Sequence, residues 1–331
     1  MEQFLGMLNA QLVLFVYIAV GMLCKKLGII DEIAKKKMTD FILKITLPCM
    51  IFNSFNQTLT PEILRKTGLA LLVSTCIAVM SYVIGKFAYN RFPEEQKHIM
   101  QYCTLVNNSG FLGLPLVSAV FGTEGLLYAS IFILPNRVMM WTAGLSIFTE
   151  SEAKRKRAAN QGGSASALDP AEEKLRQKKE HRKNLIHNVV LNPALVAVYL
   201  GLIRRLFDLP FPAFMDSAIS KIGAITSPLS MMIIGGMLIG VRLRDLFDFA
   251  ALYQSLFRLI LLPVIALAIM RLLHFDPVLT GTSLILTGMP AGSTSVLLAT
   301  QYGGDERFAS KLVISSTLLS LITAPLLMLL I

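Results

Sequence analysis

Two short polar segments interrupt long apolar stretches of this sequence. The first reads Asn107-Asn108-Ser109-Gly110, and the second reads Pro290-Ala291-Gly292-Ser293. Proline and glycine break helices, and non-helical backbone at mid-membrane depth is tolerated only where protein buries it or where it lines a wet cavity. We therefore expect helix breaks and substrate-binding residues in both segments. Close packing of helices around small residues is the alternative explanation.

The chemistry expected at these breaks is the binding of a small anion. Each half-helix that starts after a break points N–H groups with a partial positive charge at the gap. Arg137 follows Asn136 in an apolar stretch, and no acidic residue lies deep inside any such stretch. Arg137 either holds a substrate carboxylate, or is satisfied by Asn136 and helix-end carbonyls, or reaches the membrane interface because the span lies elsewhere. Lys44 and Arg258 are expected to reach the membrane interface or to pair with carbonyls.

The composition excludes a soluble protein and argues against an enzyme. Hydrophobic residues make up 54% of the 331 residues and charged residues 16%, with a mean hydropathy of +0.62, whereas about 25% of residues are charged in soluble domains. No zinc-protease, nucleophile-elbow or phosphate-loop motif is present. The net charge of +10 lies in loops. We therefore expect no nucleic-acid partner, no cofactor and no metal site.

The apolar stretches predict an all-α polytopic membrane protein with ten transmembrane helices. At about 20 residues each, they cover roughly 4–23, 38–55, 67–85, 99–121, 125–148, 185–203, 217–240, 250–270, 278–300 and 307–331. Most lysines and arginines share one side of the membrane if the N-terminus is outside. The positive-inside bias therefore predicts that both termini lie outside a bacterial inner membrane. A basic cytoplasmic loop (150–184) separates a first five-helix repeat (1–149) from a second (185–331).

The two halves carry signs of an inverted repeat. Five helices per half must enter the membrane in opposite directions if the halves share a fold. Phe121-Gly122-Thr123-Glu124 and Tyr302-Gly303-Gly304-Asp305 recur at an offset of 181 residues, which also brings the two polar segments into correspondence. Helix-breaking prolines lie at or near corresponding places; they are Pro48, Pro115, Pro228 and Pro290.

At these residues the sequence resembles the auxin efflux carrier family, in particular its bacterial malate and malonate permeases. The resemblance rests on Thr104–Asn108, on Gly113-Leu114-Pro115-Leu116 and on Met289-Pro290-Ala291-Gly292, and it covers nearly the whole chain. It implies the bile-acid-symporter/NhaA-like fold, in which broken helices 4 and 9 cross, and it implies homodimers. It further implies a scaffold of spans 1, 2, 6 and 7 and a mobile unit of spans 3–5 and 8–10, which move as an elevator.

In the plant carriers an asparagine of the fourth helix helps to bind the substrate carboxylate, and either Asn107 or Asn108 matches it. Our hypothesis is a secondary active transporter of small organic anions such as malate or malonate. The direction of transport and the coupling ion stay open. One alternative is a carrier that exports an auxin-like aromatic acid, and another is a membrane sensor that signals through the 150–184 loop.

Overall fold

The computed structural model of this chain describes residues 2–56, 60–151, 193–207, 209–239 and 248–330. Within these ranges the chain is helical, apart from turns and one isolated antiparallel bridge. Of the expected loop 150–184, all but the first two residues lie outside the described residues, as does the start of the span expected at 185–203.

The first half of the chain contains helices separated by three π-helical turns. They are α1 (Glu2–Lys26), α2 (Glu32–Phe41), η1 (Ile42–Thr46), α3 (Leu47–Ser54), α4 (Pro61–Ala88), α5 (Glu94–Leu105), η2 (Ser109–Gly113), α6 (Leu114–Met139) and η3 (Met140–Gly144). The described second half also consists of helices, with one π-helical turn. Its elements are α9 (Pro193–Leu206), α10 (Ala213–Ala224), α11 (Thr226–Leu238), α13 (Phe249–Leu256), η5 (Phe257–Leu261), α14 (Leu262–Leu272), α15 (Pro277–Thr287), α16 (Thr294–Gln301) and α17 (Glu306–Met328).

Five helical stretches of the described chain are long and apolar enough to cross a membrane. They are Pro61–Ala88, Ser109–Ser151, Ala213–Gly236, Phe249–Leu272 and Glu306–Met328. The described part of the chain is therefore all-helical, with the long apolar helices of a multi-pass membrane protein, as the composition predicts. The spans expected at 99–121 and 278–300 are each divided between two helices, because the chain leaves the helical conformation between α5 and η2 and between α15 and α16.

Three prolines explain three of the widened turns. Pro48, Pro115 and Pro263 each follow the end of a π-helical turn by two residues. A proline ring clashes with the carbonyl four residues earlier in a regular helix, and here that carbonyl always belongs to the widened turn, which relieves the clash. Of the other prolines expected to break helices, Pro228 lies in the first turn of α11 and Pro290 lies between α15 and α16.

The helices pack in two groups. In the first group, α1 and α2 pack against α11, and α3 packs against α9 and α10. In the second group, α4 and α15 pack against α6, and α17 packs against α13 and α16. A hydrophobic core around Ile51 and Val198 joins the first group to α6, and a separate core around Tyr102 and Leu312 lies within the second group. Helix α6 and the turn η2 are therefore the elements through which the groups meet.

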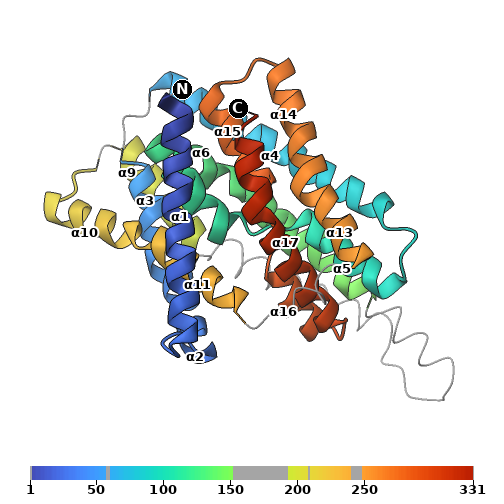
Figure 1. The fold of residues 1–331 in the computed structure, drawn as a ribbon. Coiled ribbons are helices and arrows are strands. Elements are labelled where there is room, and N and C mark those ends of the chain that lie inside the picture. Colours follow the sequence, from blue (N-terminus) through green and yellow to red (C-terminus); the bar gives the residue numbers. More distant parts are fainter. Residues whose placement is uncertain (1, 57–59, 152–192, 208, 240–247, 331) are drawn as a thin grey trace, which may run out of the picture.

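Figure 1 shows both chain ends at the same end of the molecule and α2 at the opposite end of α1. Within the second group, an ion pair ties α4 to the N-cap of α15, with Lys66 Nζ 2.8 Å from Asp276 Oδ2. Burial raises the pKa of Asp276, but the hydrogen bond and charge of Lys66 and the backbone N–H groups of Leu279 and Val278 together outweigh burial and hold this pKa below its usual range.

Candidate functional site

The two non-helical segments meet and pair with each other. Asn107 and Ala291 form an antiparallel bridge between the break after α5 and the break after α15. The backbone N–H of Asn108 donates to the carbonyl of Pro290 at 2.8 Å, and the N–H of Gly292 donates to the carbonyl of Val106 at 3.0 Å. Each break thus supplies hydrogen-bond partners to the other, which removes the cost of leaving their backbone groups unpaired inside a membrane.

Polar side chains hold this crossing in place. The Asn107 amide donates to the carbonyl of Leu286 at 2.6 Å, and its oxygen accepts the N–H of Ser109 at 3.3 Å. The Asn136 amide donates to the carbonyl of Leu105, which ends α5, at 3.0 Å. Both amide groups are therefore occupied by the protein itself and stabilise the break.

Arg258 joins the two helices that end at the crossing. Its side chain is 1% exposed, and it donates from Nε to the carbonyl of Met289 at 3.0 Å and from Nη1 to that of Thr104 at 2.9 Å. Helix C-termini carry a partial negative charge, so the guanidinium neutralises two of them at once. Of the two expectations for Arg258, pairing with carbonyls is correct. Lys44, in contrast, is exposed and pairs with Asp40.

A cavity of about 220 Å³ lies against the crossing, between the two helix groups. Five residues expected to bind substrate line it; they are Asn107, Asn108, Arg137, Gly292 and Ser293. Among the described residues, the Asn108 amide has no hydrogen-bond partner, in contrast to that of Asn107. The structure thus distinguishes two asparagines that the sequence left equivalent.

Arg137 is one of the two basic residues that line this cavity. Within the described part of the chain its guanidinium makes no hydrogen bond and no ion pair, so neither Asn136 nor a helix-end carbonyl satisfies it. The guanidinium packs against Gly110, where an added methyl carbon would lie 2.6 Å from Nη2. Only glycine lets the arginine approach the start of η2 this closely.

The cavity combines three sources of positive potential. Of its described lining residues, Lys35 and Arg137 are basic and none is acidic. The half-helices that begin at Ser109 and Thr294 both start beside it, and a helix start presents partial positive charge from N–H groups. A negatively charged ligand is the chemistry that this arrangement fits.

The remaining residues expected to bind substrate do not line the cavity of about 220 Å³. Pro290 and Ala291 are buried, and the N–H of Ala291 donates to Ser316 Oγ at 3.2 Å. Ser109 and Asn136 line a separate, small cavity of about 20 Å³, together with Arg258. These residues shape the site without facing the larger cavity.

Four polar lining residues were not expected from the sequence. They are Lys35, Thr39, Thr294 and Thr317. Thr317 could have been found, because a step of 181 residues from Asn136 leads to it. Lys35 belongs to a run of three lysines outside the apolar stretches, and nothing local distinguishes it from Lys36 or Lys37.

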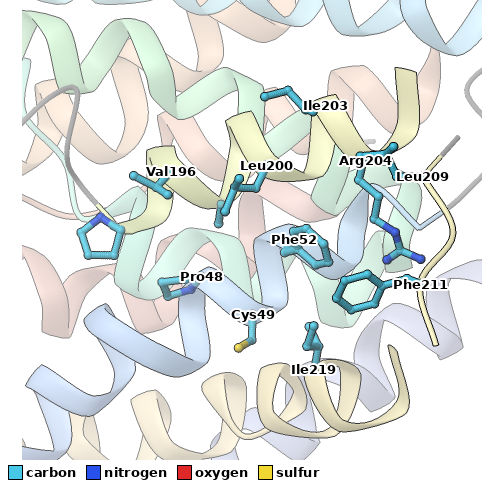
Figure 2. A pocket seen from close by; sticks show the side chains of 12 residues that line it. Pro48, Cys49, Phe52, Val196, Leu200, Ile203, Arg204, Leu209, Phe211 and Ile219 are labelled. Carbon is cyan, nitrogen blue, oxygen red and sulfur yellow. The ribbon is translucent and has the colours of Figure 1, made fainter. Parts of the chain in front are cut away.

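Two other cavities differ in chemistry. A groove of about 550 Å³, seen in Figure 2, is lined by apolar side chains of α3, α9 and α10 and by Arg204. Arg204 is held by both carboxylate oxygens of Asp216, at 2.6 and 2.8 Å, and stacks on Phe211, so the groove offers no unpaired cation. A polar cavity of about 440 Å³ is lined by Asn53 and Thr123, and its described lining includes no charged residue.

Comparison with known proteins gives a family for this chain. The membrane transport protein family matches residues 7–328. An uncharacterized transporter of Methanothermobacter thermautotrophicus is 24% identical over 328 residues, which cover 98% of each chain. One of Methanocaldococcus jannaschii is 23% identical over 322 residues, or 95% of this chain and 96% of the relative.

A third relative has a substrate in its name. The protein of Rhizobium meliloti named "Putative malonate transporter" is 22% identical over 291 residues, or 86% of this chain and 83% of the relative. The family match extends over both helix breaks and over the residues that carry the resemblance to auxin efflux carriers. The chain is therefore a membrane transporter and belongs to the membrane transport protein family.

Proposed function

We propose that this protein is a secondary active transporter of small organic anions, and that the cavity at the helix crossing binds the carboxylate. The observation that carries the proposal is the Arg137 guanidinium, which faces this cavity without an acidic or carbonyl partner in the described chain. A cation inside a membrane protein is costly unless an anion or water compensates it. A substrate carboxylate would accept hydrogen bonds from Arg137, from the Asn108 amide and from the N–H groups at the half-helix starts.

The substrate class in this proposal is a malate-like or malonate-like acid. A cavity of about 220 Å³ accommodates an acid of a few carbon atoms, and the Rhizobium relative is named for malonate. An auxin-like aromatic acid is the competing substrate, and the binding assay below includes one.

The fold in this proposal is a ten-helix inverted repeat of residues 1–149 and 185–331. Two features support it besides the paired breaks. Gly122 interrupts α6 with φ 61°, and Gly303 has φ 65°, so the two matching turns both use a left-handed glycine. The chain ends also lie at one end of the molecule (Figure 1), as an even number of crossings requires.

Transport in this proposal occurs by elevator-type alternating access. The second helix group carries the crossing and would shift against the first group, with α6 and η2 at the sliding surface. The 220 Å³ and 440 Å³ cavities would be the two access routes. A small apolar cavity shares Leu112 with the first and Leu14 with the second, which supports a closed layer between them.

The assembly and location complete the proposal. The family resemblance supports a homodimer, and the distribution of basic residues supports a bacterial inner membrane with both termini outside. The scaffold of spans 1, 2, 6 and 7 would then be the part of each protomer that does not move during transport.

The test is ligand binding to the purified, detergent-solubilised protein. Malonate, malate, acetate and indole-acetate are titrated into wild type, Arg137→Gln and Arg65→Gln, in which the exposed Arg65 of α4 is the matched control. Loss of one partner of a desolvated charge pair costs about 2 kcal/mol or more, so Arg137→Gln should weaken binding about 30-fold or more. Arg65→Gln should bind as wild type does. Unchanged carboxylate binding by Arg137→Gln, or no carboxylate binding by wild type, would contradict the proposal.

A further inference from the structure

The cavity at the crossing has a second basic residue that the substrate carboxylate at Arg137 does not use. Lys35 of α2 lines the same cavity, with Thr39 one turn further along this helix. Its described lining residues include no aspartate or glutamate. A monocarboxylate would therefore compensate one of two cations, whereas a dicarboxylate would compensate both.

The present partner of Lys35 is weak and exchangeable. Lys35 Nζ pairs with Glu32, whose side chain is 70% exposed. Glu32 is shared with Lys25, which lies 3.0 Å from its other oxygen. Exposed ion pairs of this kind contribute little, because water competes for both charges. A substrate carboxylate in the cavity can take the place of Glu32 without leaving that glutamate unpaired, because Lys25 stays bound to it.

Lys35 and Arg137 also belong to different helix groups. Helix α2 packs with η1 and α11 in the first group, whereas Arg137 lies on α6 beside the crossing. The described lining of the polar cavity of about 440 Å³ includes no charged residue. Of these two cavities, the one that α2 borders is therefore the one whose described lining offers a cation to a second carboxylate.

We propose that Lys35 is a specificity-determining residue that binds the second carboxylate of a dicarboxylate held at Arg137. The preference for dicarboxylates then arises in the conformation in which α2 borders the site. This inference rests on the proposed function, since it needs the first carboxylate at Arg137.

The experiment compares malonate with monomethyl malonate, which has the same skeleton and one carboxylate fewer, by titration into the purified full-length protein. Wild type should bind malonate about tenfold more tightly than monomethyl malonate. This ratio lies between the contribution of an exposed ion pair and that of an ion pair in a protein cavity. Lys35→Gln should weaken malonate binding by about tenfold and leave the ester unchanged, and Lys35→Arg should retain most of the preference. Glu32→Gln, which removes the competing carboxylate, should strengthen malonate binding about twofold.

The matched controls are Lys36→Gln and Lys37→Gln, which remove exposed lysines of the same helix and should bind both ligands as wild type does. Equal malonate affinity in Lys35→Gln and wild type would overturn the inference, as would an equal loss for malonate and the ester. Both results leave the proposed function standing. Failure of wild type to bind either ligand would instead overturn the proposed function.

Discussion

Replacing Arg258 tests whether one buried cation holds the helix crossing together. Arg258→Met keeps an unbranched apolar chain in the same space but removes both donors to the carbonyls of Met289 and Thr104, at 3.0 and 2.9 Å. These carbonyls lie at the ends of the two helices that meet at the crossing, and Thr104 and Met289 are both buried. The substitution therefore leaves two helix ends without their counter-charge.

The expected loss follows from these two hydrogen bonds. A hydrogen bond to a charged group contributes about 1.5–3 kcal/mol, so two of them give a loss of about 3 kcal/mol at the least. For a large domain, 1 kcal/mol corresponds to about 2–4 °C in Tm, which predicts a fall of about 6 °C or more for Arg258→Met. Arg258→Lys retains the charge but loses the planar fork, so its Tm should lie between those of wild type and Arg258→Met.

The assay is thermal unfolding of the purified protein in detergent at one fixed scan rate, because unfolding of such proteins is often irreversible. Arg258→Ala provides a second readout, since its smaller side chain leaves room beside Thr104 and Met289 for a soluble guanidinium. Methylguanidinium should raise the Tm of Arg258→Ala by mass action and leave wild type unchanged. A Tm of Arg258→Met within 1 °C of wild type, a margin of roughly 0.5 kcal/mol, would refute the reasoning.

Two further predictions concern the asparagines and an ion pair. Asn107→Ala should lower the unfolding free energy by about 1–3 kcal/mol, because the Asn107 amide bonds two backbone groups. Asn108→Ala should change the unfolding free energy by less than about 0.5 kcal/mol but weaken malonate binding about tenfold. If thermal unfolding and titration instead show that Asn108→Ala loses stability and Asn107→Ala loses binding, the two asparagines have exchanged roles. Asp276→Asn keeps an N-cap side chain and removes the charge beside Lys66. The pKa of Asp276 is lowered in the folded protein, so its stabilisation is present above the unfolded-state pKa of about 4 and is lost as the pH falls through the lower folded-state pKa. Wild type should therefore be more stable than Asp276→Asn at pH 7, by about 1 kcal/mol or less, and this difference should shrink progressively as the pH falls below about 4. A difference that stays constant as the pH is lowered would contradict the electrostatic origin.

The helix breaks were accessible to sequence reasoning because their cause is local. Proline and glycine act on the backbone of their own turn, so the interruptions near Asn108 and Pro290 follow from residue type alone. The widened turns before Pro48, Pro115 and Pro263 follow from the same steric rule, since each accommodates the ring of its own proline. The apolar stretches likewise predict membrane helices, because the bilayer imposes their length and composition.

Only the tertiary structure decided which polar groups face the cavity. The amides of Asn107 and Asn108 are adjacent and identical in the sequence, yet that of Asn107 bonds to Leu286, which is distant along the chain, and that of Asn108 has no such partner in the described part of the chain. Lys35 of α2 and Arg137 of α6 line one cavity although they are distant in the sequence, and Arg258 of η5 bonds to a carbonyl beside each break. Local chemistry determined where the chain could bend and bind. The long-range contacts determined which buried side chains were already satisfied, because most buried polar groups of a folded protein are paired with other parts of it.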